Sequence, residues 1–251
     1  MPILAFHKIE NNFNIGLNNY SPGRFNKLLR YLKNAEFKFV SLQEYLSLSD
    51  DDKIISLTFD DGYESFYDNA LPILNELELP STVFIPAGFI DKTDNWDYSG
   101  SLTPSRHLSK KQIAELPRLN VEVGSHGLSH RSLSGLSERL LKLEVGKSKE
   151  ILENITDGKV RYISYPFGRF DRAVEETALA SGYDRGFSLS SYKESGLAFT
   201  HSRFAVYAFD TPYSVNQKCG GAIKNRLEKL KGTIMNRYAG GTILLNKIRR
   251  Q

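Results

Sequence analysis

The sequence predicts an α/β fold in which parallel strands are joined by crossover helices. Apolar, β-branched segments alternate with segments of helical spacing six or seven times along the 251 residues. Five polar or aromatic residues that are candidates for a functional site follow directly after predicted strands. They are His7, Asp60, Asp61, His126 and Phe167. Active sites in such folds lie at the carboxyl ends of the strands, so this repeated placement favours a functional site there.

The strands are predicted from short apolar runs bounded by turn residues. The run at residues 53–59 is the clearest, because it ends abruptly in two acids and a glycine. In chain order the predicted strands cover residues 3–6, 37–40, 53–59, 82–85, 121–124, 160–164, 187–189 and 204–207.

Capping signals and apolar residues at helical spacing define the predicted helices. The signals are Ser21 with Pro22, Ser41 with Glu44, Ser109 with Gln112, and Asp171 with a closing Gly182. The helices predicted from them cover residues 22–32, 42–48, 63–78, a stretch from 109, 137–155 and 171–182. Pro72 is expected to bend the third of these helices, because proline has no N–H to donate.

Asp60 and Asp61 end a predicted buried strand with two adjacent carboxylates. Like charges in a partly desolvated pocket repel each other and force one pKa upward, so such a pair is costly without a use. A metal ion removes the repulsion, because one carboxylate can ligate it while the other stays free as a base. The pair alone leaves open the alternative that these acids cap the following helix.

His126 and His130 are four residues apart, which on a helical turn places both imidazoles on one face, about 6 Å apart at Cβ. With Asp61 they form a ligand set that suits Zn²⁺, and Co²⁺ and Ni²⁺ fit the same donors. Two surface histidines would be the commoner explanation of the pair alone. The full set predicts a hydrolase in which Asp60 takes a proton from an attacking water.

An acid must protonate the leaving group, and His7, His107 and His201 qualify by residue type. His7 is favoured, because it follows a predicted strand at the carboxyl end. The alternative for His7 is a structural histidine near the N-terminus.

Residues 87–107 form a long polar and aromatic stretch that interrupts the alternation of strands and helices. Loops of this length in compact domains are commonly functional, so Trp96 and Tyr98 are candidate substrate-binding residues. A mobile insertion is an equally good explanation of the composition.

The charge pattern separates a catalytic domain, residues 1–210, from a basic C-terminal extension, residues 211–251, which is expected to be helical. The net charge of +4 is unevenly placed, because this end carries many Lys and Arg residues against a single acid, Glu228. A solvated helix explains them, and peripheral contact with an anionic membrane surface is the alternative. We expect no nucleic-acid partner, and the sequence does not indicate an oligomeric state.

Cys219 is the single cysteine, so no internal disulfide is expected. The N-terminal residues do not resemble a signal peptide, and no apolar run is long enough to cross a bilayer. A cytoplasmic protein, in part at the membrane face, is therefore expected.

Three segments, taken in order, resemble the polysaccharide deacetylases of the NodB-homology type, carbohydrate esterase family 4. They are Thr58-Phe59-Asp60-Asp61-Gly62, His126-Gly127-Leu128-Ser129-His130 and Tyr165-Pro166-Phe167-Gly168. The resemblance implies a distorted (β/α) barrel of about seven parallel strands. It also implies Asp60 as the catalytic base, and Asp61, His126 and His130 as ligands of Zn²⁺ or a similar metal.

The N-terminal Leu4-Ala5-Phe6-His7 is similar to the branch of biofilm poly-N-acetylglucosamine deacetylases, in which the acid histidine lies at the start of the chain. This likeness implies His7 as the acid and Arg203 as the partner of the base. The backbone N–H of Phe167 would be the oxyanion donor, and Tyr165 joins the candidate substrate-binding residues.

The chain also departs from the family pattern. Gly127 stands where the family usually has Ser or Thr, so a hydroxyl that braces the loop is missing. Ser164 stands where an Arg commonly pairs with the base, and the C-terminal Leu-x-His motif is not found.

These observations predict a metal-dependent hydrolase that removes N-acetyl groups from a sugar in a polysaccharide, an oligosaccharide or a lipid-linked glycan. One alternative is a hydrolase of another carbon–nitrogen amide or of an acetyl ester. The other is a glycan-binding or membrane-associated protein without catalysis, on a degenerate barrel.

Overall fold

The computed structural model describes residues 2–11, 18–48, 53–93, 105–189 and 198–219, and its core is a closed barrel of parallel strands. Seven strands pair in the order β1-β10-β9-β8-β7-β6-β5, and β5 pairs back to β1, which closes the ring. Their bounds are β1 Ile3–Phe6, β5 Ile54–Phe59, β6 Ser81–Ile85, β7 Val121–Ser125, β8 Tyr162–Ser164, β9 Arg185–Leu189 and β10 Thr200–Ala205. The predicted (β/α) barrel of about seven parallel strands is confirmed.

Three shorter strands lie outside the ring. β4 (Lys38–Phe39) pairs with the start of β5, and it falls within the strand predicted at residues 37–40. β2 (Lys8–Ile9) and β3 (Asn19–Tyr20) form a small parallel sheet just beyond the carboxyl end of β1.

The prediction for the last strand was wrong in its bounds. The sequence predicted residues 204–207, whereas β10 runs over Thr200–Ala205 and pairs with both β9 and β1. Its first four residues, Thr200 to Arg203, are polar, and the last of them points into the barrel, where it donates to Thr58 and Ser164. An apolar run therefore marks only the end of this strand.

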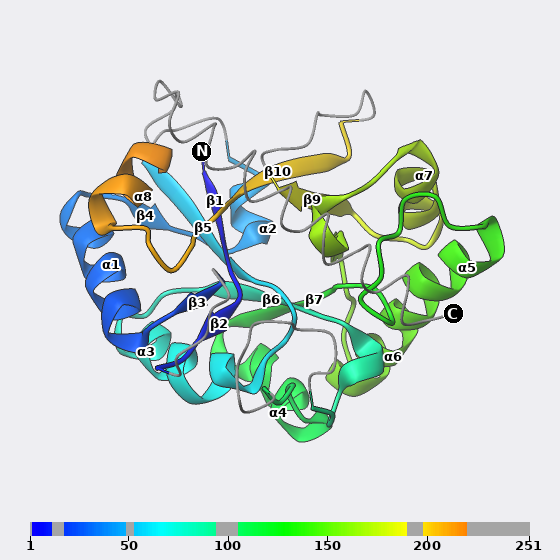
Figure 1. The fold of residues 1–251 in the computed structure, drawn as a ribbon, viewed down its shortest axis with the longest axis horizontal. Helices are drawn as coiled ribbons and strands as arrows, with labels where there is room; N and C mark the ends of the chain where they lie inside the picture. Colours follow the sequence, from blue (N-terminus) through cyan, green and yellow to red (C-terminus); the bar gives the residue numbers. More distant parts are fainter. Residues whose placement is uncertain (1, 12–17, 49–52, 94–104, 190–197, 220–251) are drawn as a thin grey trace.

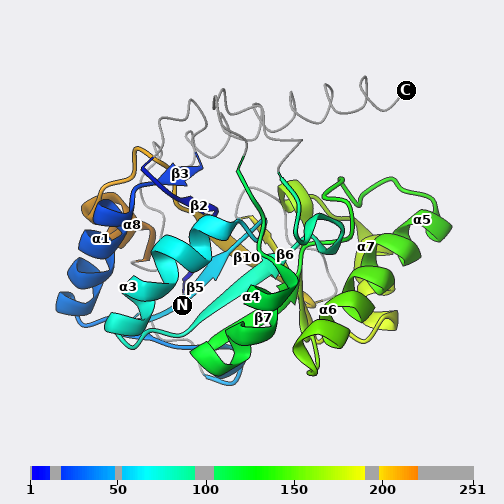
Figure 2. The same ribbon diagram turned by 90° about the horizontal axis from the view of Figure 1, so that it is seen from below.

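Helices surround the strands, as Figure 1 shows for α1, α3, α4, α5, α6 and α7. In the view from below, α4 lies beside β7, between α3 on the left and α6 on the right (Figure 2). Their bounds, with those of the others, are α1 Pro22–Asn34, α2 Leu42–Tyr45, α3 Leu71–Glu76, α4 Lys110–Glu115, α5 Glu138–Lys142, α6 Ser148–Thr156, α7 Arg172–Ala180 and α8 Pro212–Cys219.

Most of the predicted caps form. Ser109 and Gln112 make a full capping box on α4, and the side chain of Asp171 accepts from Val174 N at the start of α7. Ser21 is an exception, since it stands at the N-cap of α1 without a capping side-chain bond. Pro22 occupies the first turn there, so one of the N–H groups that a cap would serve is absent.

Two π-helical segments interrupt the long helices. η1 (Phe66–Ala70) directly precedes α3, whose first turn contains Pro72. The wider π turn accommodates the residue that cannot donate an N–H, which gives the expected irregularity a form other than a simple bend. η4 (Leu143–Lys147) lies between α5 and α6, so residues 138–156 form one helix with a π segment at its middle.

Side chains alternate between the barrel interior and the surrounding helices. On β5, Leu57 and Phe59 pack outward in the main apolar core, and the Phe59 ring lies 4.7 Å from that of Phe66 on η1. Thr58 points inward, where its hydroxyl accepts from Arg203. All six residues of β5 are buried, so burial alone does not reveal this alternation.

The predicted C-terminal extension is described only as far as Cys219. α8 packs against α1, and Lys218 binds the carboxylate of Asp210 at 2.6 Å and the carbonyl of Ala205 at 3.0 Å. Residues 220–251 lie outside the described residues. Among the helices that are described, none has the length and apolar character needed to cross a bilayer.

Candidate active site

Asp60 lies at the carboxyl end of β5 and is held by Arg203 on β10, which is separated from β5 in the ring by β1 alone. The guanidinium donates two parallel bonds to the carboxylate, Nη1 to Oδ1 at 2.8 Å and Nη2 to Oδ2 at 2.7 Å. The same two nitrogens donate to Thr58 Oγ1 at 3.0 Å and to Ser164 Oγ at 2.6 Å. Arg203 is fully buried and its guanidinium carbon lies 5.1 Å from the Phe84 ring centre.

The environment of Asp60 sets the charge of its carboxyl group. Burial acts to raise the pKa of Asp60, but the guanidinium of Arg203, with help from His126, outweighs it, so the pKa lies below its usual value. Asp60 is therefore an ionised carboxylate at neutral pH, with a fixed orientation and almost no solvent exposure.

The family pattern places an arginine at position 164, where this chain has Ser164. Asp60 nevertheless has an arginine partner, because Arg203 takes that place. The small side chain of Ser164 at the end of β8 leaves room for Arg203 to cross from β10, and the Ser164 hydroxyl joins the same network. Sequence reasoning did not identify Ser164 or Thr58 as contributors. Both are polar residues on otherwise buried strands, which is the signal that could have indicated them.

Asp61, His126 and His130 come together beside Asp60. Their ligand atoms all lie within 4.8 Å of one another, and all three residues are buried. Asp61 Oδ1 is 2.9 Å from His130 Nε2 and 3.4 Å from His126 Nε2. Burial acts to raise the pKa of Asp61, but the charge of His130 and the bonds from His126 and His130 hold it well below its usual value.

This donor set fits a divalent cation. His126 Nδ1 lies 2.8 Å from the carbonyl oxygen of Ser164, which can only accept, so Nδ1 carries the proton and Nε2 keeps its lone pair. That lone pair points to the same place as the carboxylate and the second imidazole. Two imidazoles and one carboxylate form a set suited to Zn²⁺ with coordination positions left open.

The sequence suggested that His126 and His130 share a helical turn, but they do not. β7 ends at Ser125, and the segment from His126 to His130 is a loop. Gly127 and His130 have left-handed backbone conformations, with φ of 75° and 51°, and these turn the loop so that both imidazoles face Asp61. The spacing of four is compatible with the site, but a different geometry brings the two rings together.

Three of the candidate residues have a positive φ although they are not glycine. The values are 69° for Asp61, 51° for His130 and 62° for Phe167. Residues of this kind cost of order 1–3 kcal/mol each and persist where the surrounding structure enforces them, often at functional sites. Their concentration at the ends of β5, β7 and β8 supports the location of the site.

His7 follows β1, whose Phe6 carbonyl accepts from Asp60 N at 2.9 Å, so His7 stands beside the acid pair. Its Nδ1 is buried and has no hydrogen-bond partner among the residues that the structure describes. Burial lowers the pKa of His7, although the charges of Asp61 and Asp60 act in the opposite direction. This placement is compatible with an acid that acts on a bound substrate.

The other two histidines are placed differently. His107 is buried against the rings of Tyr63 and Phe89, and its Nδ1 lies 2.9 Å from the backbone oxygen of Asp61. His201 lies near the start of β10, two residues before Arg203, and is therefore closer to the amino ends of the strands. Its ring stacks on that of Phe187. His107 thus contacts the backbone of Asp61, one of the candidate ligands, and His201 lies away from the carboxyl ends of the strands.

The candidate substrate-binding residues are not brought together. Trp96 and Tyr98 lie outside the described residues. Tyr165 is fully buried, its hydroxyl lies 3.2 Å from Thr200 Oγ1, and its ring stacks on Phe170. A side chain packed in this way has no surface for a substrate, which corrects the role expected for Tyr165.

Phe167 lies in the short 3₁₀ segment η5 (Pro166–Gly168), directly after β8. Its ring is 5.0 Å from that of His130, so the residue borders the proposed metal ligands. A backbone N–H at this position, in a left-handed turn beside the donor set, is compatible with the oxyanion role expected for it.

The fold and the site together define a (β/α)-barrel protein with a carboxylate–histidine centre at the carboxyl ends of its strands. The chain belongs to the polysaccharide deacetylase family, because the family profile described as "Polysaccharide deacetylase" matches residues 48–186, more than half of its length. The matched range contains Asp60, Asp61, His126, His130 and Phe167. It does not reach β1 or β10, which provide His7 and Arg203.

Curated relatives agree with this assignment. YxkH of Bacillus subtilis (strain 168), whose name places it among the polysaccharide deacetylases, is 27% identical over 191 residues, which are 74% of this chain and 63% of that protein. The poly-beta-1,6-N-acetyl-D-glucosamine N-deacetylase of Staphylococcus aureus is 27% identical over 190 residues, 69% of this chain and 62% of that protein. The chain therefore spans less than two thirds of the length of these relatives.

Solved structures share the fold. The Streptococcus pyogenes deacetylase PplD, solved in complex with acetate, matches with a TM-score of 0.73 and 24% identity over 86% of this chain and 96% of that one. IcaB from Ammonifex degensii matches with a TM-score of 0.73 and 23% identity over 88% of this chain and 97% of that one.

Proposed function

We propose that the protein is a metal-dependent carbohydrate N-deacetylase. It would hydrolyse the N-acetyl group of a sugar in a polysaccharide, an oligosaccharide or a lipid-linked glycan. The observation that supports this most strongly is that two adjacent acids have different partners. Arg203 holds Asp60 as an ionised carboxylate, while Asp61 faces two imidazoles in a set of donors for one cation.

The cation would be held by Asp61, His126 and His130, with Zn²⁺ as the ion that best suits these donors. When bound, such an ion lowers the pKa of a coordinated water and polarises a carbonyl oxygen. Membership of the polysaccharide deacetylase family and the name of the Staphylococcus aureus relative support an acetylated glycan as the substrate.

Asp60 acts in this proposal as the general base. Its carboxylate accepts a proton from the water that attacks the acetyl carbonyl carbon. Arg203 stabilises the carboxylate and fixes its direction, so that the proton acceptor does not need to reorient during the reaction. The backbone N–H of Phe167 would donate to the oxygen on which negative charge develops.

His7 is the proposed acid. When the carbon–nitrogen bond breaks, acetate leaves, and the sugar nitrogen accepts a proton from His7 to become an amine. His7 as a whole is half-buried, and its Nδ1 makes no hydrogen bond within the described parts of the chain, so that atom does not tie the ring to another residue.

Acetate release tests the proposal directly. The substrates would be β-1,6- and β-1,4-linked N-acetylglucosamine oligomers and a small activated acetyl ester. The proteins would be Zn²⁺-loaded wild type, chelated wild type, Asp60→Asn and Asp68→Asn, in which Asp68 is an exposed acid on η1 that serves as the matched control.

We expect release from an oligomer that is lost on chelation and in Asp60→Asn but kept in Asp68→Asn. Full activity in Asp60→Asn would rule out the assigned base. Turnover of the ester alone would favour the alternative of an acetyl ester hydrolase. Zn²⁺ binding without any turnover would favour a glycan-binding protein on the same barrel.

A further inference from the structure

Glu144 has a carboxylate that is buried beside the loop of the two histidines and has no role in the chemistry proposed above. Its side chain is only 4% exposed. It lies on the π-helical segment η4, at the middle of the helix that covers residues 138–156. A buried charge at an irregular helical turn is costly unless it is satisfied, so its partners indicate its purpose.

Within the described residues, the partners of this carboxylate come from the segment that carries the histidines. Oε2 accepts from Leu128 N at 3.0 Å and Ser129 N at 2.8 Å, and Oε1 accepts from Ser129 Oγ at 2.6 Å. Arg131 Nε, one residue after His130, lies 3.0 Å from Oε1. Four donors thus converge on one carboxylate between and immediately after the two proposed ligands.

The other end of the loop is held by the same helix. Ser148, one turn beyond Glu144, donates to the carbonyl of Gly127 at 2.9 Å and lies 2.7 Å from Ser125 Oγ. Ser125 Oγ in turn accepts from Gly127 N at 3.2 Å. These contacts provide the bracing that a hydroxyl at position 127 would have supplied.

The loop needs this support because it has no regular secondary structure of its own. Gly127 and His130 both lie in the left-handed region, and neither helix nor strand bonds fix the residues between them. The ring of His126 is separately oriented by the carbonyl of Ser164. The direction of His130, however, depends on the path of the chain from Leu128 to Arg131. Gly88 N holds this path by donating to the Leu128 carbonyl at 2.8 Å, and Glu144 holds it through the four donors above.

We propose that Glu144 is a positioning residue whose carboxylate shapes the loop so that His126 and His130 can bind one cation together with Asp61. It would thereby set the metal affinity of the site without touching the ion. The inference rests on the metal site of the proposed function, but not on the identity of the substrate.

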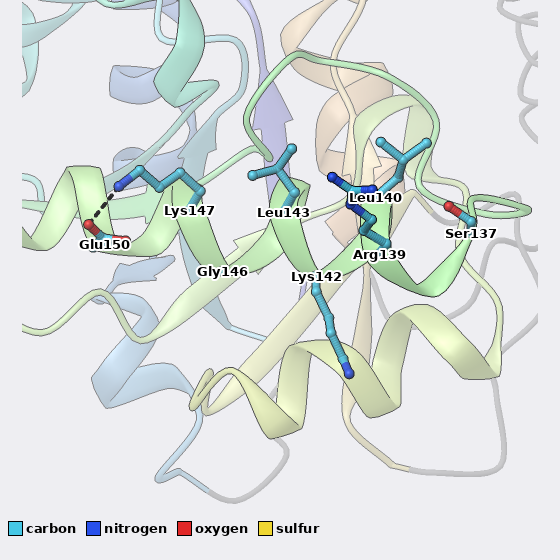
Figure 3. A pocket seen from close by; sticks show the side chains of 8 residues that line it. All are labelled: Ser137, Arg139, Leu140, Lys142, Leu143, Gly146, Lys147 and Glu150. Carbon is cyan, nitrogen blue, oxygen red and sulfur yellow. Dashed lines mark hydrogen bonds and ion pairs between the residues drawn. The ribbon is translucent and has the colours of Figure 1, made fainter.

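The same helix provides a matched control. On its outer side, residues line a shallow groove in which Lys147 pairs with Glu150 at 2.7 Å (Figure 3). Glu150 is a glutamate of α6 with a side chain that is 58% exposed. Glu150→Gln therefore repeats the chemical change of Glu144→Gln on the same helix, away from the histidine loop.

The test is the Zn²⁺ dissociation constant, measured by competition with a chromogenic chelator, together with the thermal midpoint of the chelated protein. We expect Glu144→Gln to weaken Zn²⁺ binding by about 10- to 100-fold, as loss of the partners that orient metal ligands typically does. Glu150→Gln should bind as wild type does, and His126→Ala shows how much binding occurs outside the site.

A purely structural role predicts a lower thermal midpoint of chelated Glu144→Gln with an unchanged dissociation constant, and that result would overturn the proposal. If Glu144→Gln does not fold, the Zn²⁺ affinity of Ser129→Ala tests the proposal instead. It removes one donor to Oε1, and a loss of about two- to tenfold in affinity is expected. Wild-type affinity in Ser129→Ala would then count against the proposal, as would wild-type protein that binds no Zn²⁺.

The Zn²⁺-binding test of Glu144 can succeed or fail independently of the acetate-release test of the proposed function. Zn²⁺ binding that weakens in Glu144→Gln, in a wild-type protein that releases no acetate, would support this inference and contradict the deacetylase. If the wild-type protein releases acetate but Glu144→Gln binds Zn²⁺ with the wild-type dissociation constant, the deacetylase would be supported and this inference contradicted.

Discussion

Arg203 and Asp60 meet inside the barrel, 143 residues apart in the chain, and are joined by two parallel hydrogen bonds of 2.8 and 2.7 Å. A planar guanidinium matches a carboxylate in this fork geometry, which fixes both its position and its orientation. Because Arg203 is fully buried, the pair is hardly screened by water. The proposed base therefore depends on a residue from the last strand of the barrel.

Arg203→Lys should reduce kcat/KM by about 100-fold or more, because an ammonium cannot hold the carboxylate through two parallel bonds. The pH dependence should also change. Burial raises the pKa of Asp60 and Arg203 lowers it, so a weaker partner lets the pKa rise. The base works when ionised, so the acidic limb of the kcat/KM profile should move to higher pH.

Arg161→Lys is the matched control for that experiment. Arg161 pairs with Asp184 at 3.0 Å on the surface, where ion pairs contribute little. Its profile should coincide with that of wild type. An acidic limb that stays in place in Arg203→Lys would contradict the role assigned to the arginine.

The sequence predicted most of the barrel, and it indicated Asp60 by its own pattern but Arg203 only through a family resemblance. Buried strands such as β5 are apolar runs, and the acids that end them stand out because charges are rare there. β10 was misplaced because its inward residues are polar, and Arg203 is an interior residue only in the context of Thr58, Asp60 and Ser164. Such a context is created by closure of the ring, which no local pattern contains.

The route of the histidine loop was also beyond sequence reasoning. A spacing of four fits a helical turn as well as it fits a loop with two left-handed residues. Glu144 lies 14 residues after His130 on a π-helical segment that the sequence did not predict, and only the contacts reveal that its carboxylate points inward. The pattern predicted the set of candidate metal ligands, but the residues that hold this set in place required the structure.

His7→Ala should lower turnover by about 10²- to 10⁴-fold while leaving Zn²⁺ binding intact, because a general acid acts on the leaving group and not on the ion. His107→Ala should do the opposite. It removes a contact to the Asp61 backbone oxygen, so we expect weaker Zn²⁺ binding. His201→Ala should keep both properties, since His201 stacks on Phe187 away from the acids.

Turnover and the Zn²⁺ dissociation constant, measured for each of the three variants, distinguish these roles. Wild-type turnover in His7→Ala would remove it as the acid and return attention to His107 or His201.

Removal of the metal should abolish turnover and lower the thermal stability, since an ion that binds only the folded protein stabilises it by about 2.7 kcal/mol at a concentration of 100 Kd. Asp61→Asn should lose at least 10- to 100-fold in Zn²⁺ affinity, roughly the loss seen when a partner of a ligand is removed. Calorimetric titration of Zn²⁺ into both proteins measures the affinities. A chelated wild type with undiminished turnover would exclude a metal-dependent reaction.

Asp171 offers a pH-dependent test of the fold at a distance from the catalytic acids. It caps α7 by accepting from Val174 N at 3.1 Å, and its second oxygen accepts from Ser134 Oγ at 2.6 Å and Gly135 N at 3.1 Å. Burial raises the pKa of Asp171, but the bonds from Ser134, Val174 and Gly135 outweigh it and lower the pKa.

Because the folded-state pKa of Asp171 lies below the unfolded value, the carboxylate stabilises the fold above the unfolded pKa. That contribution disappears as the pH falls through the folded pKa. Asp171→Ala should therefore cost about 0.5–2 kcal/mol of unfolding free energy at pH 7, and progressively less as the pH falls below about 4. Asp171→Asn keeps a capping oxygen without the charge, so its stability relative to Asp171→Ala should not vary with pH. Urea unfolding of the three proteins between pH 7 and pH 3 measures this, and a constant difference between wild type and Asp171→Ala would show that the ionised carboxylate does not stabilise α7.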